Sequence, residues 1–169
     1  MKKGLMELSE PGSDNVNNPL DYRHVATLVQ IYDDPSRLRN ILEPNGDMIK
    51  VEDVEKIMSL AKHWISTYAP DTFKFSLLPI GSIVTLTDLE KNIISDFEKW
   101  AEKEDVQWNS TAIHDAIHNI IKVNNAEPSD GFRIFYKVLI GKEKGPRLGF
   151  FISAIDRKII INRLKEVLN

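Results

Sequence analysis

The amino-acid sequence predicts an all-α fold, a multi-helix bundle built from two contiguous helical subdomains. Apolar residues recur at helical spacing in one segment after another, and prolines, glycines and capping residues bound these segments. No repeated strand–helix–strand pattern interrupts them, which disfavours an α/β sheet protein. With 169 residues, of which 42% are hydrophobic and 28% charged, the chain is long enough for one sizeable core or for two small helical subdomains in contact.

The N-terminal part is expected to begin with a flexible lead-in or linker at residues 1–18, which are rich in Gly, Ser, Asn and Asp. Three segments that follow have helical spacing and end at prolines or turns: about 20–32, 36–42 and 51–68. An extended connector, rather than a sheet strand, is predicted from Phe73 to Pro79. We therefore assign residues 19–80 to a first helical subdomain.

Residues 81–169 are predicted to form the second, C-terminal helical subdomain. Thr87 and Glu90 match a capping box, in which the hydroxyl accepts from an early helix N–H and the carboxylate reaches back. The helix that they open, over about 88–103, is expected to bury a set of apolar residues: Leu89, Ile93, Ile94, Phe97, Trp100 and Ala101. Further helices are predicted over 110–123 after Asn109, after Pro128-Ser129-Asp130, and over 157–168 after Asp156.

Charge is unevenly distributed along the chain. The segment from Gly131 to Asn169 holds nine Lys or Arg and three acidic residues, a net charge of +6. The whole chain carries −3, so residues 1–130 carry −9. A basic end on an acidic body is expected where one end of a protein meets phosphate. The overall pI of 5.8 argues against a general nucleic-acid coat, and DNA is not an expected partner.

Several protein classes are disfavoured by what the sequence lacks. The chain has no cysteine, which excludes a disulfide framework and a thiolate metal site. No apolar run approaches the roughly 20 residues that span a bilayer, and the N-terminus lacks the apolar core of a signal peptide. We therefore expect a cytoplasmic protein without a membrane partner.

No catalytic set can be assembled from the sequence, because the P-loop, GxSxG and dinucleotide-binding patterns are all missing. His114 and His118 lie four apart on one predicted helix. A solvated polar helix edge is favoured there over a metal site, because the HExxH pattern is incomplete. Residues 141–146 have the glycines and charge of a phosphate loop without the preceding strand, so a helix–turn–helix corner is favoured.

Aromatic and basic residues are interspersed from Phe132 to Phe151, a composition that suits single-stranded RNA. Bases stack on aromatic rings, a contact worth about 1–3 kcal/mol per base, while cations hold the phosphates. The alternative interpretation is that the phenylalanines are core residues and the lysines only solvate the surface, since such stripes are usually core.

The string IFYKVLIGKEKGPR at 134–147, followed by Gly149-Phe150-Phe151, resembles the C-terminal end of class I lysyl-tRNA synthetases of the archaeal type. Three further stretches resemble the same family in the same order: RHVATLVQI at 23–31, WISTYAP at 64–70 and FKF at 73–75. The resemblance implies an all-helical anticodon-binding region related to that of glutamyl-tRNA synthetases. It also implies a separate catalytic domain that uses ATP and Mg, and the HIGH and KMSKS signatures of that domain are absent from this chain.

In the glutamyl branch, the turn after the corresponding helix approaches the anticodon bases, and Tyr136 stands here where that branch has an arginine. The resemblance, joined to the charge pattern, gives a set of expected tRNA-binding residues: Arg133, Tyr136, Lys137, Gly141, Lys142, Lys144, Gly145, Pro146, Arg147 and Leu148. No catalytic residue, metal ligand or cofactor is expected in this chain.

The leading hypothesis is therefore a module that binds the anticodon stem-loop of lysine tRNA. Bases are expected to stack near Phe135, Tyr136 and Pro146. Four cations are expected to hold phosphates, namely Lys137, Lys142, Lys144 and Arg147. Four phosphate contacts predict a log–log salt slope of about −3, from about 0.7 per phosphate on single strands. The rival hypothesis is a helical protein-interaction module with a basic docking face.

Overall fold

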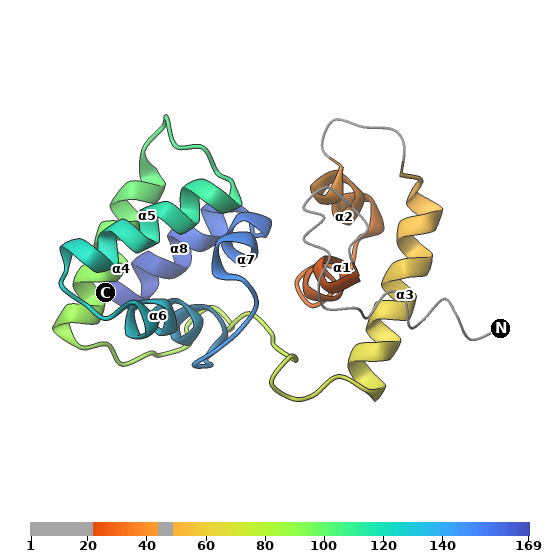
Figure 1. The fold of residues 1–169 in the computed structure, drawn as a ribbon, viewed down its shortest axis with the longest axis horizontal. Coiled ribbons are helices and arrows are strands. Elements are labelled where there is room, and N and C mark those ends of the chain that lie inside the picture. Colours follow the sequence, from red (N-terminus) through yellow and green to blue (C-terminus); the bar gives the residue numbers. More distant parts are fainter. Residues whose placement is uncertain (1–21, 44–48) are drawn as a thin grey trace. The chain divides into compact units, whose positions relative to one another are not determined.

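The computed structural model describes residues 22–43 and 49–169, so the predicted lead-in at 1–18 lies outside the described residues. Within them the chain forms eight helices and no strand, which confirms the all-α prediction (Figure 1). The described residues form two compact units, one ending at Ala69 and the other beginning at Pro70. No helix among them is both long and apolar enough to cross a membrane.

The first unit contains three helices, α1 (Tyr22–Leu28), α2 (Pro35–Leu42) and α3 (Val51–Thr67). Helix α2 begins at Pro35 because Asp34 caps it, its carboxylate accepting from the Ser36 N–H at 2.9 Å. Both α1 and α2 pack on α3. A small core results from buried residues of all three helices: Val25, Ala26, Leu28, Leu38, Val54, Met58 and Ala61. Helix α1 ends at Leu28, four residues before the predicted end, and the chain turns there before the α2 cap.

The second unit contains α4 (Asp88–Glu102), α5 (Ser110–Val123), α6 (Pro128–Ile140), α7 (Leu148–Ala154) and α8 (Arg157–Leu168). Three of the four predicted caps are confirmed, whereas Pro128-Ser129-Asp130 forms the first turn of α6 instead of capping it. The confirmed caps are the Thr87–Glu90 capping box of α4, Asn109 at α5 and Asp156 at α8. These caps are local contacts, so the sequence is enough to predict where the three helices begin.

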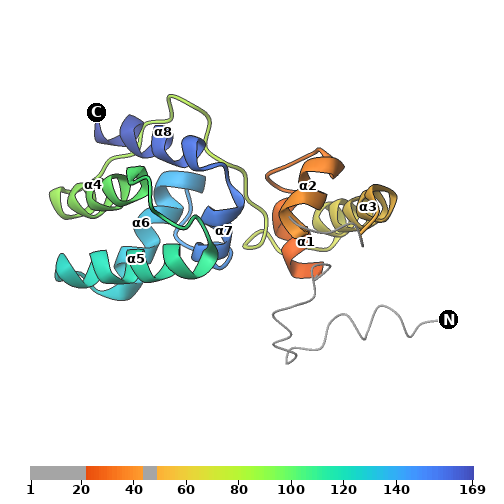
Figure 2. The same cartoon turned by 90° about the horizontal axis from the view of Figure 1, so that it is seen from above.

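Helix α6 is the central helix of the second unit, with α4, α5 and α8 packed on it (Figure 2). Six of its residues are buried, and Phe135 meets Phe97 of α4 edge to face with ring centroids 5.0 Å apart. The predicted burial of Ile93, Ile94, Phe97 and Ala101 is confirmed. Trp100 is only partly buried, and the prediction for Leu89 is wrong, since Leu89 is 45% exposed. In the first turn of α4 it is Glu90 that faces α6, where its carboxylate meets Lys137, and the neighbouring Leu89 is exposed.

The predicted connector is confirmed as extended chain without a strand, and it packs on the second unit. The Leu78 N–H donates to the Leu139 carbonyl at 2.8 Å, and Phe75 meets Phe151 edge to face at 5.3 Å. The boundary drawn from the sequence fell after residue 80, whereas these contacts join the connector to the helices that follow it. The connector thereby lies beside the C-terminal end of α6.

Candidate nucleic-acid interface

The turn between α6 and α7, residues 141–147, is called here the α6–α7 corner. Helix α6 ends at Ile140 and is capped by Gly141, whose φ of 66° and ψ of 23° are left-handed, a conformation that glycine adopts without strain. The Gly141 N–H donates to the Lys137 carbonyl at 3.2 Å and the Lys142 N–H to that of Tyr136 at 3.4 Å. This arrangement turns the chain sharply out of α6 and holds the corner in a defined position.

The side chain of Tyr136 packs against the α6–α7 corner and bonds to it. Its hydroxyl donates to the Pro146 carbonyl at 2.5 Å, and burial raises the pKa of that hydroxyl. A Cβ at Gly145 would lie 2.8 Å from the Tyr136 ring, so only glycine lets the turn close on it. The predicted residues Tyr136, Gly145 and Pro146 are therefore brought together, with the tyrosine as a half-buried support.

Lys142 joins the corner to the connector. Its ammonium donates to the Asp71 carbonyl at 2.9 Å and to the Lys74 carbonyl. Lys74 itself pairs with the Asp71 carboxylate at 3.3 Å. The sequence did not predict this contact, because 68 positions separate Lys74 from Lys142.

Two other predicted cations are already paired within the second unit. The Lys137 ammonium lies 3.1 Å from the Glu90 carboxylate, which is only 15% exposed. Burial raises the pKa of that carboxyl, but the Thr87 N–H and the Lys137 ammonium outweigh it, so the pKa lies below its ordinary value. Arg133 pairs with Asp130 at 3.3 Å on the surface of α6.

Lys144 and Arg147 differ from these residues, because both side chains are exposed and neither makes an ion pair with any described residue. Leu148, the next predicted residue, is 5% exposed and anchors the start of α7 in the core. The corner thus presents two unpaired cations on a rigid turn, with the charge of Lys142 behind them.

The remaining positive charge of the C-terminal segment is largely committed to packing of α8. Arg157 donates to the Ala101 and Lys103 carbonyls, and Lys165 pairs with Glu102 at 2.5 Å on α4. Arg163, 8% exposed, donates to the Val138 carbonyl at 3.0 Å and to Glu166 at 2.5 Å. Lys158 stays exposed. The net charge of +6 is therefore not a single cationic surface.

One predicted stacking residue is wrong. Phe135 is completely buried against Phe97, so its ring faces are covered and no base can reach them in the folded protein. The alternative interpretation, that this phenylalanine belongs to the core, is correct for Phe135.

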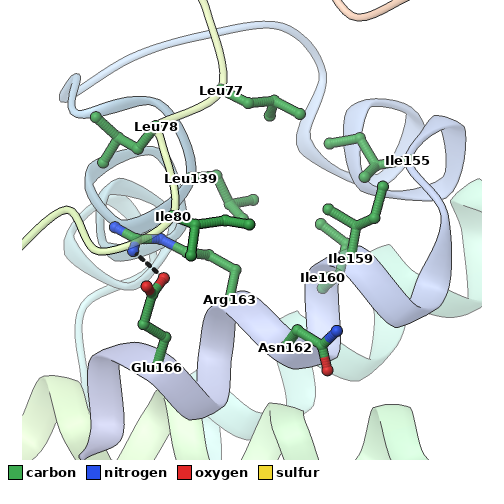
Figure 3. A pocket seen from close by; sticks show the side chains of 10 residues that line it. All are labelled: Leu77, Leu78, Ile80, Leu139, Ile155, Ile159, Ile160, Asn162, Arg163 and Glu166. Carbon is green, nitrogen blue, oxygen red and sulfur yellow. Dashed lines mark hydrogen bonds and ion pairs between the residues drawn. The ribbon is translucent and has the colours of Figure 1, made fainter.

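An apolar cavity of about 350 Å³ opens between the connector and α8 (Figure 3). Leu77, Leu78 and Ile80 line one side, and Ile155, Ile159 and Ile160 the other. The Arg163–Glu166 pair lies beneath Ile80, and the Nη2 atom of Arg163 is buried without a hydrogen-bond partner among the described residues (Figure 3). The lining of this cavity contains neither Lys144 nor Arg147, the exposed cations of the corner.

His114 and His118 lie on one face of α5, with ring centroids 6.3 Å apart. The described residues contain no group of three or more His, Asp or Glu side chains that could hold a metal ion. His114 instead stacks on Phe132 of α6, with ring centroids 5.7 Å apart and an interplanar angle of 13°.

The fold and the α6–α7 corner together describe an all-helical domain that carries two exposed cations without ion-pair partners among the described residues, Lys144 and Arg147, on the turn between two helices. No family model matches the chain. Lysine–tRNA ligases do match it: that of Thermoplasma acidophilum is 35% identical over 97% of this chain and 32% of its own length. The ligase of Thermoplasma volcanium is 36% identical over 98% of this chain and 33% of its own length. That of Borreliella burgdorferi is 32% identical over 98% of this chain and 32% of its own length.

The chain spans about a third of the length of these curated relatives. It is a homologue of lysine–tRNA ligases, and the predicted resemblance is confirmed.

Proposed function

We propose that this chain is a tRNA-binding module that docks the anticodon stem-loop of lysine tRNA, as part of a lysine–tRNA ligase. The observation that carries the proposal is the similarity to these ligases over 97% of the chain. A corner with two exposed, unpaired cations supports it, because phosphate contacts supply most of the affinity for RNA. ATP and Mg belong to a catalytic part outside this chain. We place the module in the cytoplasm, since tRNA is its proposed partner.

Within this proposal the corner residues have different roles. Lys144 and Arg147 contact phosphates directly, and Lys142 adds its charge while it holds the connector. Gly141, Gly145 and Tyr136 shape the turn. Lys137 would have to leave Glu90 to reach a phosphate, so its contribution is to position α6 against α4.

The test is a titration of the 169-residue chain with a lysine anticodon stem-loop and with the same stem-loop carrying changed anticodon bases. We expect the lysine sequence to bind about 5-fold to 150-fold more tightly, as one base contact worth about 1–3 kcal/mol implies. Equal affinity for both RNAs would overturn sequence recognition. Binding of neither RNA would overturn the proposal as a whole.

One observation favours a second function, a protein-interaction module. Ile80 and Ile83 are 97% and 96% exposed, and Ile80 borders the apolar cavity. Large apolar side chains so exposed on one segment are typical of a contact surface. A gel shift with total tRNA distinguishes the two functions, because a module that binds only proteins leaves the RNA unshifted.

A further inference from the structure

The stacked pair of His114 and Phe132 has no role in the phosphate contacts proposed above. Their rings come from different helices and are nearly parallel, with centroids 5.7 Å apart. His114 is exposed and Phe132 is half-buried. The imidazole is therefore held against an aromatic ring in an exposed residue, and the His118 ring lies beside it with a centroid distance of 6.3 Å.

Packing of α7 on α5 places this pair beside the corner. A Cβ at Gly149 would lie 2.4 Å from the Ser110 carbonyl oxygen and 3.1 Å from the Cβ of His114. Such close approach of the two backbones is open only to glycine. Gly149 follows Arg147 by two residues, a span of at most about 7 Å between their Cα atoms. The backbone of Arg147 therefore lies within about 7 Å of Gly149, the residue that packs against His114.

Helix α6 connects the pair to the corner from the other side. Phe132 and Tyr136 are four residues apart and so lie on one face of the helix. Tyr136 reaches from that face to the Pro146 carbonyl. The rings of Tyr136, Phe132 and His114 therefore lie in sequence, from the α6–α7 corner along α6 to the surface of α5.

We propose that His114, backed by Phe132, is a stacking platform for one unpaired nucleobase of an RNA loop whose phosphates contact Lys144 and Arg147. This inference rests on the proposed function and adds the residue that reads a base. Aromatic side chains beside cations are the arrangement by which proteins hold single-stranded RNA, with bases on the rings and phosphates on the cations. The cations alone would suit RNA or an acidic protein, and the stacked ring pair beside them favours RNA, because every nucleobase has a planar face that can stack on a ring.

The experiment combines variants of the chain with abasic RNA. Affinities are measured for wild type, His114→Ala, His114→Phe and the control His63→Ala, which removes an exposed histidine from the first unit. Each protein is titrated with the lysine stem-loop and with stem-loops that lack one loop base at a time. We expect His114→Ala to weaken binding about 5-fold to 150-fold, with His114→Phe and His63→Ala close to wild type.

The decisive result is that the effects on affinity of the protein substitution and of the missing base are not additive. One abasic position should weaken binding to wild type and leave binding to His114→Ala unchanged, because the contact has already been removed. The salt slope should be the same for both proteins, since stacking releases no counterions. Equal losses at every abasic position in wild type and His114→Ala would overturn the platform while leaving the proposed function intact. If wild type binds none of the RNAs, both fall together.

Discussion

The proposed function predicts how many phosphates the α6–α7 corner contacts, and replacement of Lys144 and Arg147 by alanine tests that number. Counting basic residues in the sequence suggested four phosphate contacts and a log–log salt slope of about −3. In the structure, Lys137 is paired with Glu90 and Lys142 is bonded to two carbonyls. Two cations remain unpaired, so the expected slope for wild type is about −1.4.

This difference is large enough to measure. Between 50 and 200 mM salt, a slope of −1.4 weakens binding about sevenfold, whereas a slope of −3 weakens it about sixtyfold. The single variants Lys144→Ala and Arg147→Ala should each reduce the slope to about −0.7, and the double variant should bring it close to zero. Fluorescence anisotropy with a labelled lysine stem-loop at five or more salt concentrations gives the slopes.

Lys158→Ala is the matched control, since Lys158 is also exposed but lies at the start of α8. Its slope should equal that of wild type. A wild-type slope of −3 or steeper would show that Lys137 and Lys142 leave their partners for the RNA. An unchanged slope in the double variant would refute the corner as the phosphate contact.

Three further predictions concern stability and are tested by urea denaturation. Gly149→Ala should destabilise the protein by about 1–3 kcal/mol, because the new Cβ would lie 2.4 Å from the Ser110 carbonyl oxygen; a free energy of unfolding equal to that of wild type would contradict this packing. Phe135→Ala should cost about 3–5 kcal/mol, since the ring is completely buried; a variant of wild-type stability that loses RNA binding would instead support a base contact. The hydrogen bond from Arg163 lowers the pKa of the Glu166 carboxyl in the folded protein. The ionised carboxylate therefore stabilises the fold above the pKa of about 4.3 that it has in the unfolded chain, and this stabilisation is lost as the pH falls through the lower pKa of the folded protein. The stability difference between wild type and Glu166→Gln should therefore shrink on acidification below about pH 4, and a difference that grows would refute the assignment.

The family resemblance was visible in the sequence because it resides in contiguous strings, above all residues 134–147. The candidate site was only partly predictable. Gly141, Gly145 and Pro146 do form the corner, as turn residues at that spacing indicate. Phe135 could not be distinguished from a stacking residue, because an amphipathic pattern gives the apolar face of a helix without saying what covers it.

By itself, the sequence determined the all-helical class, the connector without a strand and the caps at Thr87, Asn109 and Asp156. These features depend on contacts within about four residues, which composition and spacing specify directly. Only the tertiary structure decided which cations are free, because Lys137 meets Glu90 across 47 positions of sequence and Lys142 meets the connector across 68. Such pairs depend on how each helix is rotated against its neighbours, and that rotation is set by the packing of the whole unit.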